Sequence, residues 1–227
     1  NGGAVTMGSG QTLTATTAMS FIDLITGSGD LTISGSGVVA LTGNMTISSG
    51  STLFMSSGNT LTLQGNWIND GIFSQGTSTV TFNNTTLGQT VGGTNATTFY
   101  NLTLAKAATT LTLNKNVLIQ GASVAAPGIL LLTSGNINVN GQTFSIDLDK
   151  AYVDNSGTGT ITGSVNVSKN LSHGYYTFLG SPVSGTVNFP GICNFQNYYN
   201  ESLHDVTNPY DPGWVDESMS PSINGTN

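Results

Sequence analysis

Residues 31–63 read LTISGSGVVALTGNMTISSGSTLFMSSGNTLTL and contain the pattern that decides the fold. Short triplets in this stretch have apolar first and third residues: Leu31–Ile33, Met45–Ile47, Leu53–Met55 and Leu61–Leu63. Residues i and i+2 of a strand share a face, so each triplet can turn two apolar side chains inward. The intervening Gly, Ser and Asn residues suit sharp turns. Very short strands joined by turns, repeated without helices, predict a solenoid of parallel strands.

The repeat divides the chain into three parts. We expect an all-β fold in which residues 31–170 form a parallel β-helix, right-handed because parallel crossovers almost always are. At about three strands per coil, each turn uses about 20 residues. Residues 1–30 are either an N-terminal cap or the first coils. The composition then changes, and residues 171–227 predict a small β-rich module with an aromatic core. The sequence ends without a terminating element, so we expect this module to be truncated.

The composition excludes several classes of function. Only 7% of the residues are charged, the net charge is −7, and the four cations are all lysines. Nucleic-acid binding depends on Lys and Arg that neutralise phosphates, so we do not expect it. No apolar run approaches the ~20 residues that a transmembrane helix needs, so we do not expect membrane insertion. The chain opens on Asn1 without a signal peptide, which is typical of a processed protein or a fragment.

Parallel β-helices include many enzymes that degrade polysaccharides, so acidic residues are candidate catalysts. Glycoside hydrolysis needs carboxylates about 5 to 10 Å apart. The mid-chain candidates are Asp147, Asp149 and Asp154. Asp147 and Asp149 share a face by their spacing, but they run into a turn with Lys150 and are better explained as a strand end with a local ion pair. We therefore predict no catalytic residues and no cofactor.

Other residues are candidates for binding a metal ion or a sugar. Asp211, Asp216 and Glu217 are weak candidates for a structural Ca²⁺ site, because oxygen-rich loops in extracellular modules bind Ca²⁺. Trp67 and Trp214 are possible ligand-contacting aromatic residues that could stack on sugars if they are exposed.

Three further features of the sequence can be explained either by a function or by the fold alone. The segment 87–100 reads as a long loop, which could be a binding surface or a tolerated insertion. Cys193 is the single cysteine and is best explained as a small buried apolar residue. Pairs of the form Thr-x-Thr, such as Thr60/Thr62 and Thr79/Thr81, could match an ice lattice, but they are unevenly spaced and Thr commonly fills exposed strand positions.

Two stretches resemble a known family. Residues 65–107, GNWINDGIFSQGTSTVTFNNTTLGQTVGGTNATTFYNLTLAKA, look like the repeats of large cell-surface proteins from Bacteroidetes. Residues 175–185, YYTFLGSPVSG, resemble the module that commonly follows such repeats. The resemblance implies a secreted, adhesin-like protein exported by type IX secretion, and no catalytic residues carry over from it. The Gly-Lys-Gly-Tyr-like motif and the sorting domain that usually follow in the family do not occur in this sequence.

Together these features predict a structural stalk or adhesin segment of a secreted cell-surface protein, with extracellular glycans or proteins as partners. The alternative is a protein that binds or degrades carbohydrates. A further alternative is cargo bound to the type IX secretion machinery.

Overall fold

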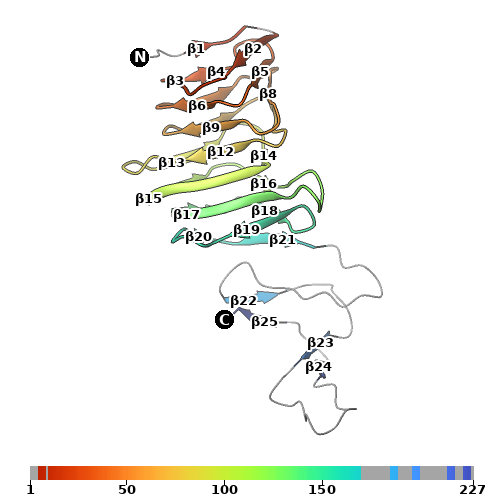
Figure 1. Ribbon diagram of the computed structural model, residues 1–227. Coiled ribbons are helices and arrows are strands. Elements are labelled where there is room, and N and C mark those ends of the chain that lie inside the picture. Colours follow the sequence, from red (N-terminus) through yellow and green to blue (C-terminus); the bar gives the residue numbers. More distant parts are fainter. Residues whose placement is uncertain are drawn as a thin grey trace. The chain divides into compact units, whose positions relative to one another are not determined.

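A computed structural model of the chain describes residues 5–8 and 10–169, together with the backbone of four later strands. The described residues form strands and turns without any helix, and most strands stack in parallel as a solenoid of about seven turns (Figure 1). Accordingly, the described part of the chain contains no helix that could cross a membrane. The predicted all-β parallel solenoid is confirmed.

The chain divides into two compact units, residues 1–170 and residues 171–227. In the second unit, β22 (Gly185–Asn188) pairs with β25 (Ser222–Gly225), and β23 (Gln196–Tyr199) pairs with β24 (Trp214–Glu217). Both pairs are antiparallel, unlike every strand pair of the first unit.

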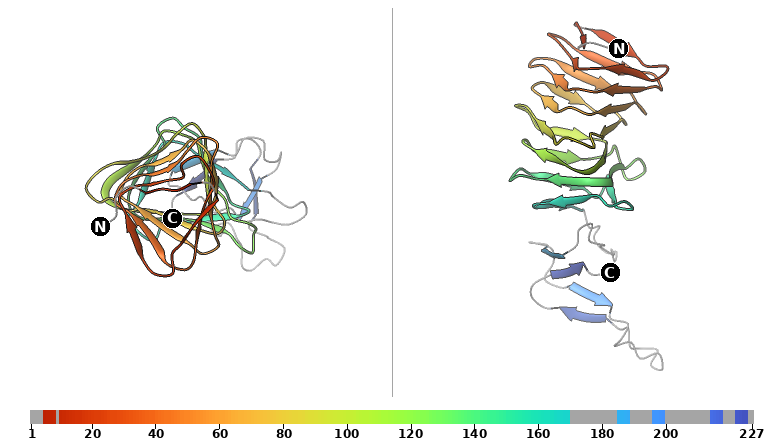
Figure 2. Two further views of the ribbon diagram at one scale, coloured as in Figure 1. Left: turned by 90° about the horizontal axis from the view of Figure 1, so that it is seen from above. Right: turned by 90° about the vertical axis from the view of Figure 1, so that its left-hand side faces the viewer.

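Viewed along the stack, each coil of the first unit turns through three strand positions, which give the solenoid three faces (Figure 2). The first face contains β3 (Met19–Phe21), β6 (Val38–Leu41), β9 (Thr60–Leu63), β12 (Thr79–Phe82), the first halves of β15 (Asn101–Leu113) and β17 (Gly128–Asn138), and β19 (Ala151–Asp154).

The second face contains β1 (Val5–Thr6), β4 (Leu24–Ile25), β7 (Met45–Ile47), β10 (Trp67–Asn69), β13 (Gln89–Gly92), the second halves of β15 and β17, and β20 (Thr160–Thr162). The third face consists of two separate sheets, β2 (Gln11–Thr14), β5 (Leu31–Ser34), β8 (Thr52–Met55) and β11 (Ile72–Ser74), then β14 (Thr97–Phe99), β16 (Val117–Ile119), β18 (Phe144–Asp147) and β21 (Val165–Ser168). Residues 5–25 therefore form the first coils.

The core follows the apolar triplets. In β5, β7 and β9 the first and third residues of the triplet are buried, and the middle residue faces outward. In β8, Leu53 and Met55 are buried while Phe54 is 40% exposed, so the alternation holds even where the middle residue is apolar. One continuous apolar cluster extends from Ala15 to Ala151.

Coil length varies, although the strands remain in register. The aligned residues Leu61 and Val80 are 19 positions apart, whereas Leu102 and Leu130 are 28 apart. The extra residues lie in the loop 120–127 and in a bulge of β15 near Ala105, which shifts its register against β17. The expectation that residues 87–100 form one long loop is wrong, because β13 and β14 occupy half of this segment.

Glycines permit the tight corners between faces. A Cβ added to Gly65 would lie 2.2 Å from the backbone carbonyl of Gly43 in the previous coil. Gly93 has a φ of +106°, which only glycine adopts readily, and an added Cβ there would lie 2.3 Å from the Asn69 carbonyl oxygen. At these corners the backbones of successive coils approach too closely for any side chain.

Candidate functional site

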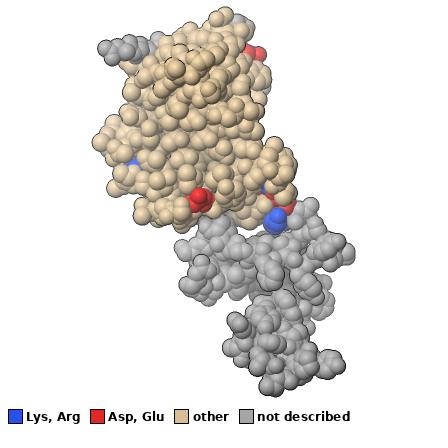
Figure 3. Space-filling view, viewed as in Figure 1, with Lys and Arg blue, Asp and Glu red and all other residues tan. Residues whose placement is uncertain are grey.

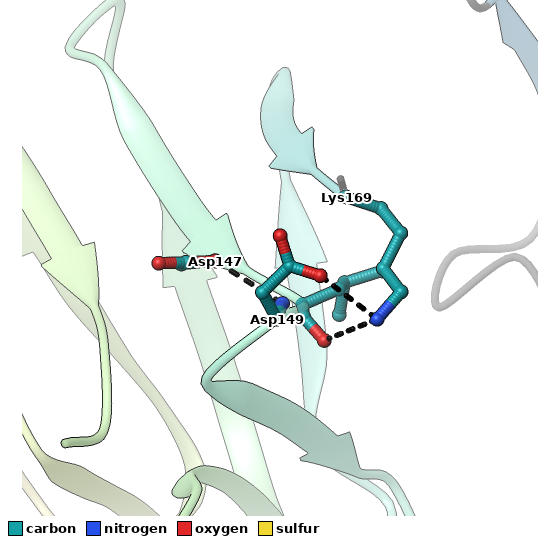
Figure 4. Close-up of polar contacts among 4 residues, drawn as sticks. Asp147, Asp149 and Lys169 are labelled. Atoms are coloured by element: carbon teal, nitrogen blue, oxygen red, sulfur yellow. Dashed lines mark hydrogen bonds and ion pairs between the residues drawn. The ribbon is translucent and has the colours of Figure 1, made fainter. Parts of the chain in front are cut away.

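The carboxylates of the last coils make local structural contacts. Asp147 Oδ2 accepts a hydrogen bond from Gln120 Nε2 at 2.8 Å, and its Oδ1 accepts one from the Asp149 backbone N–H at 3.1 Å. Asp149 Oδ1 lies 2.9 Å from Lys169 Nζ, which also donates to the Leu148 carbonyl at 3.4 Å (Figure 4). An ion pair at this strand end was predicted, but its cation is Lys169 of the next coil instead of Lys150.

Asp154, the third candidate acid, lies at the end of β19. Its Oδ1 accepts a hydrogen bond from the Ser156 backbone N–H at 3.0 Å. Hydrogen bonds from Ser156 hold the pKa of the Asp154 carboxyl below its ordinary value. A general acid in glycoside hydrolysis needs the opposite shift, so the environment of Asp154 suits a turn-stabilising role better than proton donation.

Trp67 belongs to the core. Its side chain is 0% exposed, so the prediction that it could contact a ligand is wrong. The ring packs edge-on against Phe73 and Phe99, with centroids 4.7 Å and 5.3 Å away, and Phe82 extends the cluster through Phe99. The Trp67 indole N–H donates to Thr97 Oγ1 at 3.2 Å. Trp67 begins β10 with an inward position of the alternating pattern, and that position buries it.

The candidate residues of the second unit are not described beyond their backbone. Trp214, Asp216 and Glu217 lie in β24, whereas Asp211 and Cys193 lie outside the described residues. Within the described part of the chain, no group of three or more His, Cys, Asp or Glu residues could hold a metal ion.

Two of the Thr-x-Thr pairs align across coils. Thr79 of β12 lies beside Thr60 of β9, and Thr81 lies beside Thr62, although the coils differ in length. The next strand, β15, begins Asn-Leu-Thr, and β6 presents apolar residues at the matching positions. The aligned threonine pairs are thus two coils deep.

A ladder of polar side chains, which the sequence analysis missed, ties successive coils together on the approach to the second face. The Asn44 backbone N–H donates to Asp23 Oδ1, Asn66 N–H donates to Asn44 Oδ1 at 2.7 Å, and Thr90 N–H donates to Asn66 Oδ1 at 2.8 Å. The available signal was an Asx residue directly before the apolar strand at spacings of 21 and 22 residues. These bonds satisfy corner amides without charge pairs.

Lys106 is the second feature that the sequence analysis missed. It lies in β15, its side chain is 0% exposed, and its ammonium donates to three neutral oxygens. The acceptors are Gln89 Oε1 at 2.7 Å, the Asn84 carbonyl at 3.1 Å and the Leu87 carbonyl at 3.2 Å. Burial lowers the pKa of Lys106 from 10.5 to about 8. An alternating pattern with Lys106 at an inward position, two residues after Leu104, was the available signal.

No protein-family model matches this chain, and neither does any curated protein or any solved structure.

Proposed function

We propose that this chain is a structural stalk or adhesin segment of a secreted cell-surface protein and that it carries out no chemistry of its own. The observation that carries the proposal is the continuous apolar core, which extends from Ala15 to Ala151 and joins neighbouring coils along the solenoid. Parallel backbone pairing joins the coils with hydrogen bonds, and side-chain ladders such as Asp23–Asn44–Asn66 add further ones. A solenoid whose repeats each pack on their neighbours is suited to span a distance.

The outer surface supports the same role. On the face seen in Figure 3, charged side chains of the described residues appear at only a few points. Because exposed charge pairs contribute little, salt has little electrostatic stabilisation to screen. A segment built in this way keeps its shape across a range of ionic strengths, as a stalk outside the cell must.

Placement at the cell surface rests on the resemblance of residues 65–107 and 175–185 to repeat proteins of Bacteroidetes. By that resemblance, type IX secretion is the export route of the proposal, and glycans or proteins outside the cell are the partners.

Carbohydrate binding is the competing function, and one observation favours it. Tyr152 of β19 is 45% exposed on the first face, where its ring could stack on a sugar. Trp67 cannot take this role because it is buried.

A glycan-array screen of the purified full chain, with product analysis of any polysaccharide that binds, tests the proposal. We expect no cleavage, since the described carboxylates are engaged in local contacts. Binding without cleavage would identify an adhesin, and a Tyr152→Ala variant would show whether β19 is the contact. Absence of binding would identify a stalk, and cleavage would overturn the proposal.

A further inference from the structure

Lys106 combines burial, hydrogen bonding and the absence of a countercharge. It is fully buried, its ammonium is matched by three hydrogen-bond acceptors, and none of the acceptors carries a charge. Two of the three are the Asn84 and Leu87 carbonyls, which belong to the turn 83–88 between β12 and β13 (Figure 1). The third is the side chain of Gln89, itself 1% exposed. One side chain of β15 thereby fastens a turn of the preceding coil.

We propose that Lys106 is a proton-dependent latch that closes the turn 83–88 over the coil that follows it.

The surrounding contacts couple opening of the turn 83–88 to exposure of the Lys106 ammonium. Gln89 Oε1 also accepts from the Asn84 backbone N–H at 3.1 Å, and Thr109 Oγ1 donates to the Asn84 carbonyl at 2.7 Å. Asn84 Oδ1 in turn accepts from the backbone N–H groups of Thr86 and Leu87 at 3.0 and 2.9 Å. Lifting the turn removes two of the three acceptors of Lys106 and admits water to its ammonium.

No neighbouring charge offsets the burial. The segments that meet around Lys106 are residues 60–65, 79–92, 101–113 and 128–138, and Lys106 is the only Asp, Glu, His, Cys, Tyr, Lys or Arg in all four. Removal from water therefore acts alone on this ammonium, and it disfavours the charged form. That explains why the pKa of Lys106 falls from 10.5 to about 8 while the turn is closed.

The direction of the pH dependence follows from this shift. When the turn opens, Lys106 meets water and its pKa returns toward 10.5, so between about pH 8 and 10.5 the open form binds more protons. Closure is favoured as pH rises through this window, and the equilibrium constant for opening falls by up to tenfold per pH unit. The neutral amine still donates two hydrogen bonds, so the closed turn keeps a connection to Lys106 after the proton leaves.

The test uses the full chain in two measurements. The chain contains only four lysines, so ¹³Cε-labelled lysine gives four signals whose titrations can be followed by NMR. We expect one signal to titrate near pH 8 and to disappear in Lys106→Met. Amide hydrogen exchange of a peptide covering residues 83–89, corrected for the intrinsic pH dependence of exchange, should show protection that rises by up to tenfold per pH unit above pH 8.

The variants separate the latch from general effects. In Lys106→Met the corrected protection should no longer depend on pH, whereas Lys115→Met, altered in the same coil, should behave as the unaltered chain. The proposal is overturned if all four lysines titrate together near their ordinary pKa. It is equally overturned if the protection of residues 83–89 is independent of pH in the unaltered chain, or if its rise persists in Lys106→Met. The NMR titration and the exchange measurement on the unaltered chain need no variant, so either can still overturn the proposal if Lys106→Met fails to fold.

Discussion

Replacement of Trp67 by alanine tests whether the aromatic cluster holds the middle coils together. Trp67 is fully buried and contacts the rings of Phe73 and Phe99, which come from the same coil and from the next one. Truncation of a buried Trp costs about 3–5 kcal/mol through lost transfer energy and the resulting cavity. Each edge-on ring pair contributes about 0.5–1.5 kcal/mol within such a loss. We therefore expect Trp67→Ala to lower the free energy of unfolding by about 4 kcal/mol, a large fraction of the 5–15 kcal/mol of a typical domain.

Urea unfolding of the full chain, followed by circular dichroism, measures this loss. Trp67→Phe keeps a ring but removes the indole hydrogen bond to Thr97, so it should lose less than the alanine variant. Ile72→Ala is the matched control, because Ile72 lies in the same coil and is 63% exposed. A loss below about 1 kcal/mol in Trp67→Ala, comparable with that of Ile72→Ala, would refute the inward placement of Trp67 and restore it as a candidate ligand contact.

Three further predictions concern the contacts between coils. Gly65→Ala should lower the melting temperature by many degrees because its Cβ would meet the Gly43 carbonyl, whereas Gly92→Ala, with its closest neighbour 3.6 Å away, should be tolerated in the same thermal melt. Asn66→Ala should cost about 1–2 kcal/mol in urea unfolding, since the Thr90 N–H loses its acceptor, and an unchanged midpoint would contradict the ladder. Raising NaCl should change the free energy of unfolding by less than about 1 kcal/mol, and a larger loss would show charge pairing beyond the described ion pair between Lys169 and Asp149.

Much of the fold could be predicted because the apolar pattern is local. The alternation within a triplet such as Leu61–Leu63 predicts both a strand and the side chains that point inward. The observed burial follows this alternation through the coils. The pattern does not say how many residues a turn may absorb. For that reason residues 87–100 were predicted as a loop although they contain β13 and β14. Register depends on which strands lie side by side in space. Coils of 19 and of 28 residues therefore stack in register, and the difference in length is absorbed outside the paired positions.

The site residues were harder to predict, for reasons that differ between them. Trp67 was a possible ligand contact only if exposed, and its place at an inward position of β10 decides its burial. The partner of Asp149 was expected nearby in sequence at Lys150, whereas stacking brings Lys169 of the next coil within 2.9 Å. The burial of Lys106 was not predicted, since a lysine in a strand is normally assumed to reach solvent.

This solenoid contains few charged residues, and Lys106 is the one buried lysine in its described part. Inter-coil contacts such as Asn66–Thr90 join a neutral side chain to a backbone amide, so they do not change protonation near neutral pH. The carboxylates of Asp23 and Asp149 accept a backbone N–H and pair with Lys169, respectively. Among the described residues, Lys106 is the group whose pKa is moved to about 8. With the proposed latch, the described part of the solenoid would respond to mildly alkaline pH at one turn, between β12 and β13, where an ammonium is buried without a countercharge.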